Sequence, residues 1–152
     1  MYWEEKIDLL AKKYGQTAFK VPFTDWPEIM KKIENSFIIK ENANTHFSNW
    51  AGNIRQKIKF DEVAFNKLEN YMVLLSGSIH YWVVIVPGRN PNEKHYVYDC
   101  KLPALMALIE LCSGDFYIID KKYQWLTYFN RDREANMVHV YKSGAHKIPF
   151  EK

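Results

Sequence analysis

Cysteine is scarce in this 152-residue sequence, which contains only Cys100 and Cys112. One pair of cysteines is too few for a disulfide framework, and its spacing is not that of a zinc site. We therefore expect no metal site and two free, buried thiols, as in proteins kept in a reducing cytosol. A thiol in apolar surroundings has a raised pKa and is a poor nucleophile, so a catalytic cysteine–histidine pair built on Cys100 is not favoured.

Glycine is also scarce, and the six glycines are isolated from one another along the chain. A phosphate-binding loop needs several glycines close together, so that backbone N–H groups can converge on the anion. The sequence contains no nucleotide-binding motif and no nucleophile-elbow motif. We therefore expect no cofactor.

The histidines lack the spacing of a catalytic or metal-binding motif. None forms HxH or HExxH, and the five are His46, His80, His95, His139 and His146. Three of them fall in predicted strands and could meet across a sheet, where paired histidines and a lysine would suit metal-independent RNA cleavage. Strand alternation explains the same residues without any ligand. We therefore predict no catalytic residues, and we keep a nucleic-acid-binding or nuclease-like protein as the alternative.

Long apolar runs are missing as well. No stretch approaches the roughly 18 apolar residues that a membrane-spanning helix needs. The N-terminus, MYWEEKIDLLAKK, has acidic residues where a secretory signal peptide has basic ones, and no apolar segment follows it. These features predict a cytoplasmic protein that has no membrane partner.

The sequence does contain enough apolar material for a core. Hydrophobic residues make up 47% of the chain and charged residues 26%, with a formal net charge of +3. This balance is typical of globular proteins, and the mild positive charge falls short of the clustered basic charge of dedicated nucleic-acid binders. The length suits a single domain over residues 1–152.

Helical periodicity is clear in four segments. In WEEKIDLLAKKY, for example, Ile7, Leu10 and Tyr14 share one face, and acidic residues precede basic ones as the helix dipole favours. The fourth segment, at residues 101–114, has apolar residues on nearly all sides, which predicts that it is buried against a sheet. Helices are predicted at residues 3–14, 24–37, 61–74 and 101–114.

Segments rich in β-branched and aromatic residues predict the strands. The first of them, HYWVVIV, is apolar on both faces, which is typical of an interior strand and predicts that Trp82 lies in the core. Strands are predicted at residues 80–86, 94–100, 115–120, 124–129 and 136–142. The order of elements predicts an α+β fold, in which N-terminal helices precede β-β-α-β-β-β and a five-stranded, largely antiparallel sheet packs against the helices.

Residues 38–58 fit neither pattern. They are polar and rich in asparagine, with apolar residues such as Trp50 only scattered among them. We predict a long connection with one helical turn. A connection of this length is uncommon in a compact domain and is sometimes functional.

Aromatic and basic residues gather in residues 115–142. Such a segment could stack nucleic-acid bases beside basic groups, but alternation gives each strand an apolar face, and the basic residues fall at the turns. We therefore expect the rings mainly to fill the core. Tyrosine and arginine are also frequent at the centres of protein interfaces, and the predicted partner-binding residues are Tyr123, Tyr128, Arg131 and Arg133.

Residues 116–126, FYIIDKKYQWL, resemble a segment of small, mostly uncharacterised bacterial proteins, in which an aromatic-Tyr-Ile-Val/Ile strand runs into Lys-Lys-Tyr-x-Trp-Leu. HYWVVIV, HYVYD and LPALMALIEL precede it in the order found in those proteins. Where they tend to carry Asn-His-His after the Trp-Leu strand, this chain reads YFNRDRE, which keeps Asn130 and lacks the histidines.

Proteins of this kind resemble the immunity and accessory proteins of bacterial toxin systems. The resemblance implies no established enzyme activity, and it favours a non-enzymatic protein that binds a protein partner, a toxin that it neutralises. It also implies that any chemistry served by the missing histidines is absent from this chain.

Overall fold

The computed structural model describes residues 3–22, 24–40, 47–86, 97–112, 114–144 and 146–151. His46 and His95 lie outside the described residues, as does the first part of the strand predicted at residues 94–100.

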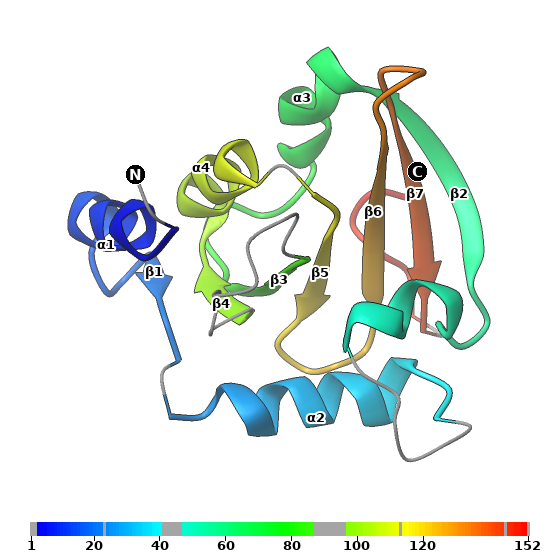
Figure 1. The fold of residues 1–152 in the computed structure, drawn as a ribbon, viewed down its shortest axis with the longest axis horizontal. Helices are drawn as coiled ribbons and strands as arrows, with labels where there is room; N and C mark the ends of the chain where they lie inside the picture. Colours follow the sequence, from blue (N-terminus) through cyan, green and yellow to red (C-terminus); the bar gives the residue numbers. More distant parts are fainter. Residues whose placement is uncertain are drawn as a thin grey trace.

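The described residues form an α+β fold around an antiparallel sheet of seven strands, in the order β1-β4-β3-β5-β6-β7-β2 (Figure 1). The α+β class with an antiparallel sheet is confirmed, whereas the predicted number of five strands is wrong. The strands are β1 (Phe19–Lys20), β2 (Ile58–Ala64), β3 (Tyr81–Ile85), β4 (Val97–Cys100), β5 (Phe116–Asp120), β6 (Leu126–Asp132) and β7 (Met137–Ser143).

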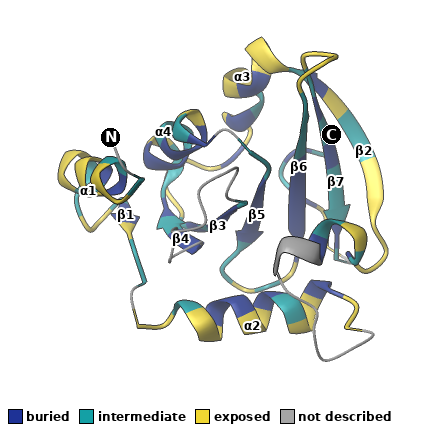
Figure 2. Ribbon diagram, in the orientation of Figure 1, coloured by how far each residue is buried: buried dark blue, intermediate teal, exposed yellow. Residues whose placement is uncertain are grey.

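Helices cover both faces of the sheet (Figures 1 and 2). Residues of α1, α3 and α4 pack on one face, which we call the α4 face. Residues of α2 and η1 pack on the other, the α2 face. The helices are α1 (Trp3–Tyr14), α2 (Trp26–Phe37), α3 (Leu68–Met72) and α4 (Leu102–Leu111), and the 3₁₀ helices are η1 (Phe47–Gly52) and η2 (Phe65–Lys67).

The two additional strands lie at the two edges of the sheet. The two-residue β1 pairs with β4, and the longer β2 pairs with β7 around a bulge between Lys59 and Asp61. The predicted helix at 61–74 is wrong in its first half, because residues up to Ala64 belong to β2 and the α-helix starts only at Leu68. Pairing with β7 buries Val63 on the α4 face, and this long-range contact outweighs the helical spacing of the local sequence.

The asparagine-rich connection contributes to the core, which the sequence did not indicate. Within residues 47–58 the chain forms η1, and an antiparallel bridge joins Ile38 to Ile54. The Trp50 side chain is 0% exposed, and its ring meets that of Tyr117 edge-on at 5.4 Å between centroids. This segment therefore closes the α2 face of the sheet.

Strand alternation was predicted correctly, but both faces turn out to be core. Phe116 and Phe129 stack on the α4 face at 4.7 Å between centroids, while Tyr117 and Tyr128 stack on the α2 face at the same distance. The rings of residues 115–142 thus fill the interior, as expected. Trp82 is less central than predicted, because it is only half-buried and the Lys121 ammonium lies 3.3 Å from the centre of its ring.

Both cysteines are free and buried, as predicted. Burial raises the pKa of the Cys100 thiol well above its usual value. Among the described residues, no helix combines the length and the apolar character needed to cross a membrane.

Candidate functional site

The four predicted partner-binding residues do not form one surface. Tyr123 lies in the turn before β6, whereas Arg131 lies near the far end of that strand and Arg133 lies in the turn after it. Tyr128 is only 3% exposed and packs on the α2 face, so its ring is a core residue. The predicted cluster is therefore wrong, and only the two arginines come together.

Tyr123 is held in its turn on the α2 side of the molecule. Its backbone has a φ of 55°, and its N–H donates to the Asp120 carbonyl. The half-buried ring packs against the α2 face core, with the Lys32 ammonium 5.9 Å from its centre. These contacts within the chain explain the position of the Tyr123 ring, so no binding partner is needed to explain it.

Arg131 and Arg133 line a groove of about 940 Å³ on the opposite side, the α4 face. Two short helical elements, η2 and α3, form one wall, and α4 forms the other. We call this hollow the α3–α4 groove. Its apolar lining is Phe65, Leu68, Met72, Pro103, Met106, Ala107, Ile109 and Leu111, and its polar lining includes Glu69, Glu110, Cys112, Arg131, Arg133 and Asn136.

Arg131 is the most constrained charge in the groove. Its side chain is half-buried, Nη2 donates to the Ile109 carbonyl at 3.0 Å, and Nε is buried without a hydrogen-bond partner. The guanidinium carbon lies 5.0 Å from the centre of the Phe65 ring and 5.6 Å from that of Phe116. Burial lowers the pKa of Arg131 from its usual value, which reflects the cost of keeping a charge in apolar surroundings.

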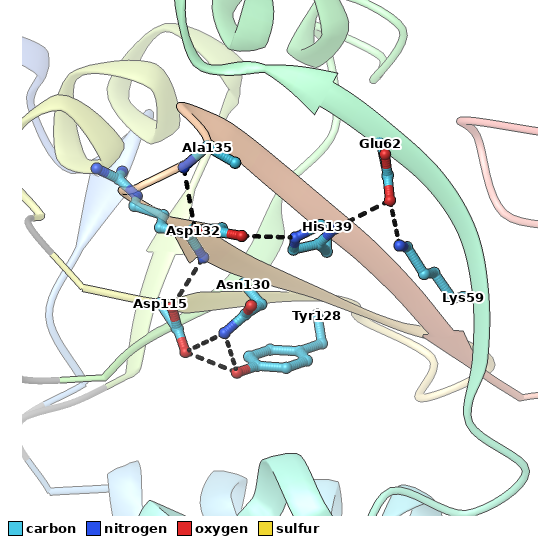
Figure 3. A network of polar contacts seen from close by, with 9 residues as sticks. Lys59, Glu62, Asp115, Tyr128, Asn130, Asp132, Ala135 and His139 are labelled. Carbon is cyan, nitrogen blue, oxygen red and sulfur yellow. Dashed lines mark hydrogen bonds and ion pairs between the residues drawn. The ribbon is translucent and has the colours of Figure 1, made fainter.

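A half-buried carboxylate fixes the backbone from which Arg131 projects (Figure 3). Asp115 Oδ1 accepts the backbone N–H of Arg131 at 3.0 Å, and Oδ2 accepts the Tyr128 hydroxyl at 2.6 Å and the Asn130 amide at 3.1 Å. Asp115 lies just before β5, and the other three residues belong to β6. This network joins the two strands on the α2 face while the Arg131 side chain points into the groove on the α4 face.

A second group of polar residues lies beside this network on β7, β6 and β2 (Figure 3). His139 stands between two carboxylates, with Nδ1 3.3 Å from Glu62 Oε1 and Nε2 3.4 Å from Asp132 Oδ2. Glu62 also pairs with Lys59, and this hydrogen bond lowers the pKa of the Glu62 carboxyl. Within the described part of the chain, no three His, Cys, Asp or Glu side chains are arranged to hold a metal ion.

The thiol that lines the groove is held by the fold. The one thiol in its lining, Cys112, is 3% exposed and directs its S–H to backbone carbonyl oxygens. The rest of the lining is an apolar hollow with two arginines and two glutamates among its polar residues, and aromatic and arginine side chains are frequent at the centres of protein interfaces. Both arginines were predicted from the sequence, whereas the groove and Asp115 were not; the only signal for Asp115 is its position between Gly114 and an apolar strand.

Fold and site together define an α+β protein with an antiparallel sheet, helices on both faces and an arginine-lined groove between two of the helices. Residues 12–148 match the model of a family of unknown function, DUF6756, and the chain belongs to this family. No curated protein and no solved structure matches the chain.

Proposed function

We propose that this protein is a non-enzymatic, cytoplasmic protein-binding protein that acts as a bacterial immunity protein by neutralising a toxin. The binding surface in this proposal is the α3–α4 groove. The observation that carries it is Arg131, a half-buried guanidinium that forms no ion pair with a carboxylate anywhere in the described residues. A buried charge without an opposite charge is costly, so such an arginine favours a partner that supplies one.

Neighbouring residues support a protein partner. Phe65 is 42% exposed at the edge of the groove, and Arg133 is exposed beside it. Aromatic and arginine side chains contribute a large share of the binding energy at protein interfaces. The assignment of the partner as a toxin rests on the resemblance of residues 116–126 to the segment found in immunity-like proteins.

The alternative of nucleic-acid binding has less support. The rings that could stack on bases are buried, with Phe116 and Phe129 at 0% and Tyr128 at 3% exposed. Two glutamates, Glu69 and Glu110, share the groove with the arginines and would repel a phosphate backbone. Salt separates the two functions, because backbone binding to nucleic acid loses orders of magnitude in affinity between low and moderate salt.

Removing the arginine charges should weaken binding to the toxin that the proposal requires, to be sought among the products of neighbouring genes, by at least about tenfold, or about 1.4 kcal/mol. The variants are Arg133→Gln and Arg131→Gln, and the affinity is measured by calorimetric titration.

The stability of the two alanine variants should differ. Arg133→Ala should leave the free energy of unfolding within about 0.5 kcal/mol of the wild type. Arg131→Ala should cost about 1–2 kcal/mol, because a hydrogen bond and ring contacts are lost.

Lys31→Gln provides the matched control, since it removes one positive charge from an exposed position on α2, on the other side of the sheet. It should bind like the wild type. Full-strength binding by Arg133→Gln and Arg131→Gln together would show that the groove is not the interface.

A further inference from the structure

We infer that Arg131 is a carboxylate receptor, and that the α3–α4 groove takes a peptide segment of the partner in which an acidic side chain stands beside an apolar one. This inference rests on the proposed protein-binding function and names the chemistry of the partner. The acidic group would pair with the Arg131 guanidinium, and the apolar side chain would enter the hollow between α3 and α4.

The donors of Arg131 define the kind of group that is missing. Nη2 is used by the Ile109 carbonyl, whereas the buried Nε has no partner. Phe65 and Phe116 lie against the guanidinium, with their ring centres 5.0 and 5.6 Å from its central carbon. The buried Nε is closed to an external group, so a carboxylate from a partner would approach the Nη nitrogens from the groove, where a charge-assisted hydrogen bond to a guanidinium is strong.

The protein's own nearby carboxylate is not available for this role. Both oxygens of Asp115 are occupied, Oδ1 by the backbone N–H of Arg131 and Oδ2 by Tyr128 and Asn130. As Figure 3 shows, Asp115 turns toward those groups on the α2 face. The backbone of Arg131 is therefore fixed by an internal acid, while its guanidinium is left for an external one.

The rest of the groove indicates what accompanies the acid. Met72 and Met106 are part of its lining, and methionine adapts its shape to varied apolar groups. Exposed apolar side chains continue along the η2–α3 segment, with Phe65 at 42%, Val73 at 59% and Leu74 at 53% exposure. A surface that extends beyond the hollow favours a peptide segment over a small molecule. The glutamates of the groove favour a singly charged carboxylate over a phosphate group.

The test compares two capped peptides, acetyl-Leu-Leu-Asp-Phe-amide and its asparagine counterpart, added to the ¹⁵N-labelled full chain. The NMR signals of the groove and the Nε–Hε signal of Arg131 report binding. We expect the aspartate peptide to shift the Arg131 signal and to bind at least tenfold more tightly than the asparagine peptide. Equal affinities, or no shift at Arg131 at millimolar peptide, would overturn the inference.

Variants and a small acid complete the design. Arg131→Gln should abolish the preference for aspartate, Arg131→Lys should keep part of it, and Lys31→Gln should keep all of it. The amide spectrum checks that each variant is folded. 4-Phenylbutanoate tests whether the carboxylate belongs to a peptide or to a small molecule. If it binds more weakly than the aspartate peptide, a peptide ligand is supported; if it binds more tightly, the peptide ligand is ruled out.

The outcomes for this inference and for the proposed function differ. If the arginine variants weaken toxin binding but the two peptides bind equally, the protein-binding function stands and the carboxylate receptor is rejected. If the peptides are discriminated but no toxin domain from a neighbouring gene binds, the receptor stands and the immunity function is rejected.

Discussion

Replacing Trp50 with alanine should lower the free energy of unfolding by about 3–5 kcal/mol, the usual cost of emptying a buried aromatic site. The side chain is 0% exposed and packs in the α2 face core with Ile33 and Tyr117. The hole it leaves would lie between η1 and the sheet, where α2 also packs. Chemical denaturation monitored by circular dichroism gives the measurement.

Trp82→Ala provides the comparison, because the same side chain is removed from a half-buried position at the margin of the same core. It should cost about 1–2 kcal/mol, since much less apolar area returns to water. A loss for Trp50→Ala that is no larger than the loss for Trp82→Ala would mean that residues 47–58 are not an integral part of the α2 face.

Asp115→Ala should be the most damaging change to the polar network, with a loss of about 3 kcal/mol in the free energy of unfolding. The substitution leaves the Tyr128 hydroxyl and the Arg131 N–H without their acceptor, and the Asn130 amide keeps only the Tyr128 hydroxyl. Hydrogen bonds to a charged group contribute about 1.5–3 kcal/mol each, and losing several at once leaves polar groups unsatisfied in a part-buried site. Thermal and denaturant unfolding measure the effect.

Asp132→Ala is the matched control, since its carboxylate is 40% exposed and accepts from the Ala135 N–H at the turn after β6. It should cost less than about 1 kcal/mol. Equal losses for the two aspartates would show that the Asp115 network does not hold the end of β6. Asp115→Ala should also shift the groove signals in an NMR spectrum, because the backbone of Arg131 loses its anchor.

Most helices and strands could be predicted from the sequence where the local pattern of residues favours the same structure as the packing around the segment. The apolar helix at 102–111 and the strands around it were found because an interior element is apolar wherever it packs. The β2 strand was missed because pairing with β7 across the chain, and not its own residues, decides its conformation. The burial of Trp50 was not predicted because its neighbours in the sequence are polar. Its side chain is buried because η1 packs on the sheet, which the local sequence does not indicate.

The candidate site was predicted in part, for a geometric reason. Arg131 near the end of β6 and Arg133 in the turn that follows this strand both line the same groove. Tyr128 projects to the other face, and Tyr123 is separated from the arginines by a seven-residue strand that spans about 20 Å. Proximity in sequence therefore suggested a patch that strand geometry does not allow. The groove itself depends on the packing of α3 beside α4, which no local pattern encodes.

Hydrogen–deuterium exchange of the full chain, alone and with a candidate toxin domain found among the products of neighbouring genes, locates the surface to which a partner binds. We expect the added protection to concentrate at residues 65–74, 105–112 and 131–136, the segments around the α3–α4 groove. Arg133→Gln should reduce that protection at equal concentrations, and Lys31→Gln should not. Protection confined to α2 or to the β2 edge, with the groove unchanged, would contradict the account.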